Sequence, residues 1–285
     1  TQTVFQPQWM PSGGLLFSAE PEGWWNLQIW DGNTVRPLHK AEREFGLPQW
    51  AFGMSTTAVC GHGIAALSCT AGLWALVLID HQTGEAREIK LPFSSITQLR
   101  SDGSKLSFLG SSPEQARSLV LLDPESGEWE IIRSSATVAI PQDCISTGEP
   151  ISFATADGET AYAMLYLPAN GQYRGPADRL PPLIVKSHGG PTAAATNGLS
   201  LGTLYWTSRG FAVADVNYRG STGFGRMYRQ SIHGKWGIVD VEDCCAVAEH
   251  LVRQAVVDPD RLAITGGSAG GYTTLACLAF RDVFS

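Results

Sequence analysis

Two features missing from this sequence each remove a class of function. The 285 residues contain no basic run and carry a formal net charge of −7, which argues against a surface that attracts nucleic acid. No apolar stretch approaches the length of a membrane span. We therefore expect partners other than nucleic acid or a membrane.

A regular cysteine framework is also missing. The six cysteines form no C-x-x-C pair and stand at positions 60, 69, 144, 244, 245 and 277. This spacing favours free thiols over disulfides, and free thiols indicate a reducing compartment, so we expect a cytoplasmic protein. The chain has no signal-peptide pattern. It begins Thr1-Gln2-Thr3 without an initiator methionine, and we expect the natural N-terminus to lie upstream.

Metal ligands at a recognisable spacing are missing as well. The charged run 235–243 holds three acidic residues but no histidine at ligand spacing. We interpret it as the acidic start of a helix, where the helix dipole favours negative charge. We expect neither a metal nor a cofactor.

The first half of the chain repeats itself. Pro7-Gln8-Trp9 recurs 41 positions later at 48–50, and the pair Asp80 and Gly84 recurs 43 positions later as Asp123 and Gly127. Between these marks lie short strand-like runs, at 15–18, 26–30, 64–69 and 105–109. A period of about 40–45 residues with about four strands is typical of propeller blades.

We therefore predict that residues 1–140 form about three blades, the last of a β-propeller. Closed propellers need at least about four blades, so the array is expected to continue before this start. The alternative is a β-sandwich with accidental similarity. Six of the nine tryptophans fall in the first 74 residues, and we interpret them as packing between blades.

The second half alternates apolar strands with helices. A Ser-, Pro- and Gly-bearing linker at 134–150 leads to a hairpin at 151–167 with an Asp157-Gly158 turn. Strands are predicted at 183–186, 211–216 and 261–264, and helices at 199–208 and 239–254. This pattern indicates a mostly parallel sheet with helices on both faces, so we predict that 141–285 is the N-terminal part of an α/β-hydrolase domain.

The stretch 265–272, which reads TGGSAGGY, carries the strongest chemical signal. It places Ser268 between Gly266 and Gly270, after an apolar strand and before the apolar helix 273–280, as in a nucleophile elbow. The two glycines are expected where strand and helix approach too closely for side chains. We predict that Ser268 is the nucleophile and that the Ala269 amide, at the helix N-terminus, binds the developing oxyanion.

A second signal follows the strand 183–186. Ser187-His188-Gly189-Gly190 occupies the place of the H-G-G loop of α/β-hydrolases. Its glycines let the backbone approach a substrate, and we favour the Gly190 amide over Gly189 as the second oxyanion donor. His188 is interpreted as a residue that orients the loop or lines the substrate. A role as the catalytic base is the alternative.

A third stretch, 217–226, follows the next strand and should lie at the same end of the sheet. Its glycines indicate a loop, in which Tyr218 and Arg219 could line the cleft. For Arg219, a structural salt bridge is the favoured alternative.

Together these motifs resemble the prolyl oligopeptidase family of serine peptidases, in its acylaminoacyl-peptidase and dipeptidyl-peptidase-like branch. The resemblance implies a propeller that caps an α/β-hydrolase and admits short peptides. It also implies that Ser268 attacks the peptide carbonyl while the Ala269 and Gly190 amides hold the oxyanion. The motifs are SHGGPT (187–192), YWTSRGFAV (205–213), NYRGSTGFGR (217–226), WGIVDVEDC (236–244) and GGSAGGYTT (266–274).

The chain departs from the family pattern at both ends. Family members have further blades before this start and, after the elbow, a further segment with the triad acid and base. Here no histidine follows Ser268, and the one acid is Asp282; the six histidines stand at 39, 62, 81, 188, 233 and 250. We therefore expect a piece of a longer protein, truncated at both ends, that is inactive by itself.

The predicted function is a serine peptidase that removes aminoacyl or dipeptidyl units from short peptides. An esterase or lipase on the same fold is one alternative, because a fold does not fix its chemistry. A non-catalytic propeller interaction module is another, although the intact elbow argues against it. The sequence leaves the oligomeric state open, so a monomer and an oligomer are both compatible with it.

Overall fold

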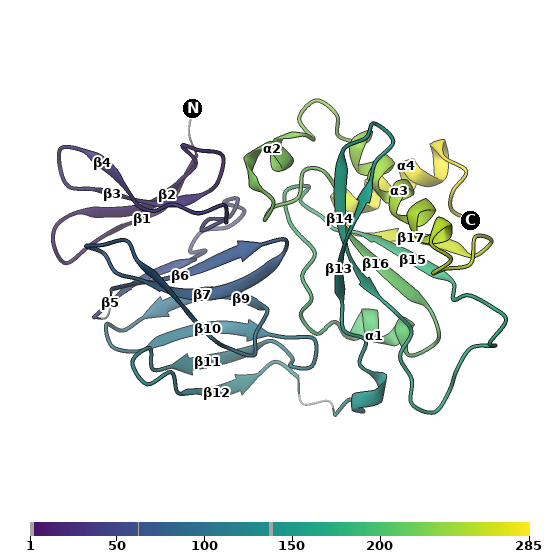
Figure 1. Ribbon diagram of the computed structural model, residues 1–285, viewed down its shortest axis with the longest axis horizontal. Helices are drawn as coiled ribbons and strands as arrows, with labels where there is room; N and C mark the ends of the chain where they lie inside the picture. Colours follow the sequence, from purple (N-terminus) through teal and green to yellow (C-terminus); the bar gives the residue numbers. More distant parts are fainter. Residues whose placement is uncertain (1–2, 62, 137–138) are drawn as a thin grey trace. The chain divides into compact units, whose positions relative to one another are not determined.

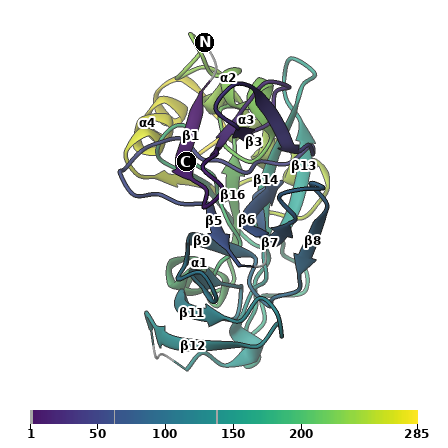
Figure 2. The same cartoon turned by 90° about the vertical axis from the view of Figure 1, so that its left-hand side faces the viewer.

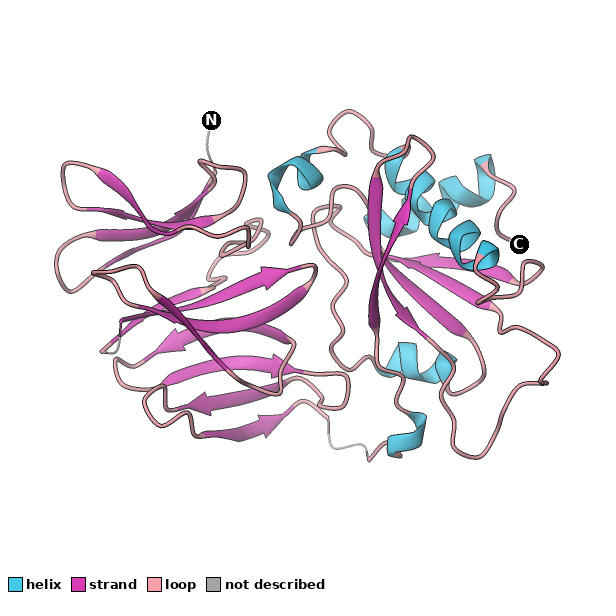
Figure 3. Cartoon of the chain, viewed as in Figure 1, coloured by secondary structure: helices cyan, strands magenta, loops and turns pink. Residues whose placement is uncertain are grey.

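The computed structural model describes residues 3–61, 63–136 and 139–285. The chain divides into two compact units, Thr1–Thr137 with Gly223–Met227, and Val138–Thr222 with Tyr228–Ser285. Figure 3 shows strands throughout the first half of the chain and a mixture of strands and helices in the second.

The described part of the first unit contains three four-stranded antiparallel sheets, each built from consecutive strands. The described residues before position 137 form no helix, so the predicted blades are confirmed. The first sheet is β1 (Val4–Trp9), β2 (Leu15–Ala19), β3 (Asn26–Trp30) and β4 (Val35–His39). The second is β5 (Thr57–Cys60), β6 (Gly63–Thr70), β7 (Leu73–Ile79) and β8 (Ala86–Ile89), and the third is β9 (Ser95–Ser101), β10 (Leu106–Ser111), β11 (Ser118–Leu122) and β12 (Trp129–Ser134).

One turn recurs in all three blades, directly after the third strand. Asp80 Oδ1 accepts hydrogen bonds from the second and third amides that follow it, each at 2.8 Å. Asp123 does the same at 2.9 and 3.2 Å, and Asp31 at 2.8 Å to both amides. Backbone amides, with that of Thr83 first, lower the pKa of Asp80 because they stabilise its carboxylate. The 43-residue spacing of Asp80 and Asp123 therefore marks equivalent turns.

The other repeat mark was wrong. Pro7-Gln8-Trp9 lies in β1, whereas residues 48–50 lie outside the strands, before β5. The tryptophan prediction holds only in part. Trp25 and Trp74 are buried, but Trp9 and Trp50 are 68% and 60% exposed. Three shared letters impose no backbone geometry, so the match carried no structural information.

The second unit contains one five-stranded sheet in the order β13-β14-β16-β15-β17. Strand β15 pairs parallel with both β16 and β17, while β13 and β14 form the predicted hairpin, which lies beside β16 (Figure 2). The strands are β13 (Glu149–Ala154), β14 (Thr160–Tyr166), β15 (Leu183–Ser187), β16 (Ala212–Asn217) and β17 (Leu262–Gly266). The helices of this unit are α1 (Leu201–Thr207), α3 (Val239–Arg253) and α4 (Ala269–Phe280), and the single turn η1 (Gln142–Cys144) lies in the expected linker. Helix α2 (Gly225–Gln230) begins in the segment Gly223–Met227, which belongs to the first unit.

Helices cover both faces of this sheet, as predicted. Figure 1 shows α3 and α4 on one side of the fanned strands and α1 on the other. Alternate strand residues such as Val185, Ala214 and Ala163 share a buried core with α3 and α4. Helix α3 matches the helix predicted at 239–254, and its apolar residues Val241, Cys244, Cys245, Ala248 and Leu251 are buried.

Three further observations complete the comparison. Helix α2 was not predicted, because its start is rich in glycine and was interpreted as loop. All six cysteines are free thiols, as expected. None of the helices in the described part of the chain is long and apolar enough to cross a membrane.

Strand β17 forms one edge of the sheet, and it has one strand neighbour among the described residues. The adjoining helix α4 exposes Tyr272, Leu275, Leu278 and Phe280. Helix α4 therefore presents exposed apolar side chains beside an edge strand of the sheet.

The repeated turn offers a matched test of packing within the first unit. Gly84 and Gly127 have φ values of 75° and 77° in equivalent turns. A Cβ atom on Gly84 would overlap the Leu38 carbonyl oxygen, whereas one on Gly127 would meet nothing within 4 Å. Gly127→Ala should cost about 1–2 kcal/mol for the left-handed backbone alone. Gly84→Ala should cost about 1–3 kcal/mol more, measured as a lower apparent melting temperature. Equal losses in the two variants would contradict the structure.

Candidate active site

Ser268 lies at a sharp turn between β17 and α4. Its backbone angles are φ 56° and ψ −122°, which a residue with a side chain rarely adopts. Strand β17 ends at Gly266 and helix α4 begins at Ala269, so the predicted strand–turn–helix context is confirmed. The residue is exposed. Strain of this kind holds a nucleophile above the end of a sheet.

The flanking glycines are required by close packing, as predicted. A Cβ atom on Gly270 would overlap the carbonyl oxygen of Ser187, at the end of β15. A Cβ atom on Gly266 would overlap the Gly270 carbonyl oxygen and the Ser187 hydroxyl. Because neither glycine carries a Cβ atom, the Ser187 hydroxyl can donate to the Gly270 carbonyl at 2.9 Å. The start of α4 therefore rests directly on the end of β15.

The H-G-G loop lies against the nucleophile. A Cβ atom on Gly189 would stand 3.4 Å from Ser268 Cβ and 3.9 Å from Ser268 Oγ. Gly190 has a φ of 124°, which favours glycine. The structure thus brings the two predicted pieces of the site together.

The amides of the two predicted oxyanion donors differ from those of Gly270 and Gly271. The Gly270 and Gly271 amides donate back to the carbonyls of Gly267 and Ser268, each at 3.0 Å. The Ala269 and Gly190 amides, by contrast, have no hydrogen-bond acceptor among the described residues. The convergence of both amides within about 6 Å of the Ser268 hydroxyl stays a prediction.

Both ring nitrogens of His188 have partners. Nδ1 lies 2.7 Å from the Gly189 carbonyl oxygen and Nε2 lies 2.7 Å from the Ser221 hydroxyl. The ring stacks on Tyr218, with centroids 4.3 Å apart. Burial lowers the pKa of His188, although the Gly189 contact opposes this effect. These contacts fit the loop-orienting role and leave no nitrogen free for the alternative base role.

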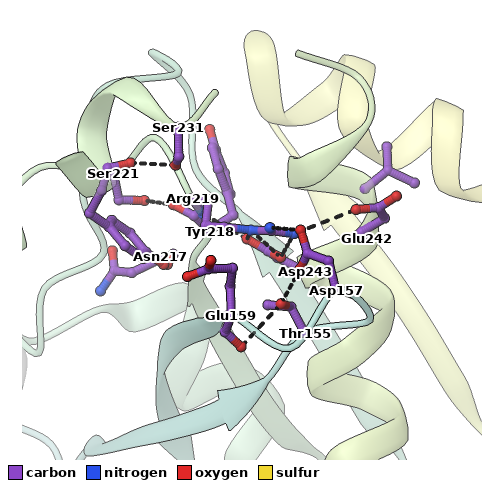
Figure 4. Close-up of polar contacts among 12 residues, drawn as sticks. Thr155, Asp157, Glu159, Asn217, Tyr218, Arg219, Ser221, Ser231, Glu242 and Asp243 are labelled. Carbon is purple, nitrogen blue, oxygen red and sulfur yellow. Dashed lines mark hydrogen bonds and ion pairs between the residues drawn. The ribbon is translucent and has the colours of Figure 1, made fainter. Parts of the chain in front are cut away.

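Arg219 forms the structural ion pair that was favoured for it (Figure 4). Its guanidinium contacts both oxygens of the fully buried Asp243, with distances from 2.8 to 3.1 Å. It also contacts Asp157 at 2.6 Å and Glu242 at 3.5 Å. The Arg219 amide donates to Asp243 at 2.7 Å, so the pair fixes the loop backbone as well as the side chain. Burial alone would lower the pKa of Arg219, but the bonds to Asp243 and Asp157 raise it overall.

The acidic run has the helix-start role that was predicted. Asp240 and Glu242 lie in the first turn of α3. Asp240 also accepts a hydrogen bond from the Gly237 amide at 2.7 Å and from the Thr273 hydroxyl of α4 at 2.6 Å. These carboxylates therefore have structural partners, and one of them ties α3 to the elbow helix.

Sequence reasoning missed the cluster around His188. Tyr218 and Ser221 contact a histidine that stands about thirty positions earlier, and no local pattern links them. The available signal was topological: β15 and β16 are neighbouring parallel strands, so the segments after them meet at one sheet end.

Propeller blades followed by an α/β sheet with this elbow define the class of propeller-bearing α/β-hydrolase fold proteins. Residues 197–285 match the model of the prolyl oligopeptidase family.

Two curated relatives illustrate the match. Over 265 residues the chain is 33% identical to the acylamino-acid-releasing enzyme of Sus scrofa, covering 93% of this chain and 32% of that protein. Over 139 residues it is 38% identical to dipeptidyl aminopeptidase BIII of Pseudoxanthomonas mexicana, covering 48% of this chain and 20% of that protein. The chain thus spans no more than about a third of either relative.

Solved structures resemble the whole described chain. A puromycin hydrolase is 37% identical with a TM-score of 0.95, covering 99% of this chain and 43% of that one. A puromycin-hydrolyzing peptidase of Mycobacterium tuberculosis is 36% identical with the same TM-score, covering 100% of this chain and 44% of that one.

The contact between α4 and β15 can be tested with neighbouring glycines. Gly270→Ala should cost about 3 kcal/mol or more, because main-chain oxygen atoms cannot move away cheaply. Gly267→Ala should stay within about 0.5 kcal/mol, because a Cβ atom there meets nothing within 4 Å. Thermal melting of both variants measures the difference. A Gly270→Ala protein as stable as Gly267→Ala would show that the close contact is not real.

The ion-pair network predicts a dependence of stability on pH. Hydrogen bonds from Thr155 and then Arg219 lower the pKa of Asp157 to about 2. A lowered pKa stabilises the fold at neutral pH, and this contribution is lost as the pH falls from about 4 towards 2. The side chain is 48% exposed, so Asp157→Asn should cost at most about 1 kcal/mol at pH 7. Denaturant unfolding should show the two proteins converging at low pH, whereas a constant difference from pH 7 to pH 2 would refute the assignment.

Proposed function

We propose that the protein is a serine peptidase that hydrolyses short peptides through an acyl-enzyme on Ser268. The observation that carries this proposal is the strained Ser268 turn with Gly189 pressed against it. A structural turn would gain nothing from a backbone this strained at an exposed serine.

The geometry supports a definite sequence of steps. Ser268 Oγ attacks the carbonyl carbon of the substrate while a base removes the hydroxyl proton. The oxyanion that forms accepts hydrogen bonds from the Ala269 and Gly190 amides, neither of which has another acceptor among the described residues. The amine leaves with a proton, and water then hydrolyses the ester on Ser268 by the same steps.

The base for this reaction is proposed to lie outside these 285 residues. In α/β-hydrolases the acid and the histidine follow the nucleophile in the sequence. No histidine follows Ser268 in this sequence. His188 is held by Gly189 and Ser221, and His250 lies in helix α3.

The substrate class is proposed from the names of the relatives. Acylamino-acid-releasing and dipeptidyl-aminopeptidase activities both act near the N-terminus of a peptide, which supports an aminoacyl- or dipeptidyl-releasing enzyme. The two solved structures described above are a puromycin hydrolase and a puromycin-hydrolyzing peptidase, so puromycin belongs among the test substrates.

The proposal is tested in the complete polypeptide that carries this sequence. Wild type should react with a fluorophosphonate probe and cleave short peptide p-nitroanilides, whereas an esterase would cleave acyl esters and leave the p-nitroanilides intact. Ser268→Ala should lose the label and lower kcat by up to about a millionfold, because the nucleophile is gone. Ser146→Ala removes a buried hydroxyl that donates to the Leu167 carbonyl, and it should keep both activities.

Two results would overturn the proposal. Labelling that persists in Ser268→Ala would place the nucleophile elsewhere, and cleavage of acyl esters without any cleavage of peptide p-nitroanilides would favour an esterase. Residues 1–285 produced alone should give no burst of product from an activated ester. A burst that Ser268→Ala abolishes would reveal a base within the chain, and His188 would be examined first.

A further inference from the structure

The orientation of one peptide unit decides whether the Gly190 amide can serve an oxyanion. The Gly189 carbonyl and the Gly190 N–H belong to the same planar peptide, in which they point in opposite directions. Glycine on both sides leaves this unit free to rotate, because neither residue restricts its backbone angles. Something must therefore hold it in one orientation.

His188 supplies that restraint. Its Nδ1 lies 2.7 Å from the Gly189 carbonyl oxygen. Since a carbonyl oxygen only accepts hydrogen bonds, Nδ1 must carry the proton. The imidazole then holds the Gly189 carbonyl on its own side, and the Gly190 N–H faces away from it.

The other ring nitrogen is held by Ser221. The Ser221 hydroxyl lies 2.7 Å from His188 Nε2 and 2.7 Å from the Tyr218 carbonyl oxygen, so it links the ring to the loop backbone. Ser221 is fully buried, so no water competes for these contacts. Loss of the Ser221 hydroxyl would remove the contact that holds Nε2 and so loosen the ring that holds the Gly189 carbonyl.

Tyr218 fixes the position of the ring and of the preceding peptide. Its ring stacks on His188 at an interplanar angle of 19°, and its hydroxyl donates to the His188 carbonyl at 2.9 Å. The loop that carries Tyr218 and Ser221 is held in turn by the Arg219 ion pair with Asp243 (Figure 4). Support for the loop thus runs from α3 through Arg219 to His188.

We propose that Tyr218 and Ser221 are positioning residues that, by fixing the ring of His188, aim the Gly190 N–H into the oxyanion site. The inference rests on the proposed function, in which this N–H stabilises the transition state. Neither residue touches the reacting atoms. Their effect passes through His188 and one peptide plane.

Kinetics of the complete polypeptide test this inference. An oxyanion contact forms only in the transition state, so Ser221→Ala and Tyr218→Phe should lower kcat by about tenfold to a hundredfold and leave KM within about twofold. Ser146→Ala and Tyr166→Phe are matched controls, because each removes a hydroxyl that donates to a main-chain carbonyl elsewhere in the same unit. Both controls should keep kcat within about twofold.

A double-mutant cycle separates positioning from general destabilisation. If Ser221 acts through His188, Ser221→Ala should have no further effect on kcat in a His188→Ala background. If the losses of kcat from Ser221→Ala and His188→Ala multiply in the double variant, the inference is overturned. A change confined to KM, or an unchanged kcat in Ser221→Ala, would overturn it as well. Melting temperatures confirm that each variant is folded, and Tyr218→Phe keeps the test decisive should His188→Ala not fold.

A crystal structure of Ser221→Ala tests the inference independently of catalysis. The Gly189–Gly190 peptide should be flipped or should occupy two orientations. A peptide that keeps its single orientation would overturn the positioning role even if the enzyme is active. A protein that shows this flip but neither hydrolyses peptides nor reacts with the probe would instead refute the proposed function and leave the positioning geometry standing.

Discussion

The site depends on the contact between helix α4 and the end of strand β15. This contact exists because Gly270 and Gly266 carry no side chain, which lets main-chain atoms of the two elements meet directly. It places the strained Ser268 beside the loop that begins at His188. The nucleophile and the predicted oxyanion donors are thus parts of one packed unit, and a shift of the helix would move both. Ser187 adds a hydrogen bond across the same contact.

The buried ion pair of Arg219 and Asp243 supports the loop that contacts His188. Burying Arg219 and Asp243 is costly unless each charge is fully paired, and here the guanidinium satisfies both carboxylate oxygens and two further acids. Lysine could not replace arginine at 219, because a single ammonium group cannot present the planar fork that these contacts use. The pair contributes a fixed loop conformation, which the stacked pair of Tyr218 and His188 requires.

The parts of the structure that the sequence predicted are those set by local geometry. The elbow was predictable because the spacing of Gly266, Ser268 and Gly270 reports a backbone constraint within five residues. The blades were predictable from Asp80 and Asp123, which mark a turn with its own hydrogen bonds. The hairpin around Asp157 followed from strand alternation and turn chemistry. In each case the residues that form the signal are also the residues that make the contact.

What the sequence could not predict depends on contacts between distant segments. His188, Tyr218 and Ser221 meet only because β15 and β16 lie side by side, and their spacing along the chain carries no pattern. Helix α2 begins at a glycine with positive φ, which propensity alone assigns to a loop. The second Pro-Gln-Trp triplet misled because identical letters were taken for identical positions, with no turn or strand pattern to support them.

The aspartate turns have a consequence for how such an array of blades changes over time. The bonds that close each turn join residues at most five positions apart, so little chain entropy is lost in forming them. Hairpins of this kind form within about microseconds. A duplicated or deleted stretch of one repeat would therefore bring with it, or take away, a complete closing turn. Gain or loss of a blade then requires new packing between sheets but no new turn chemistry, which makes the number of blades easier to change than the architecture of any one of them.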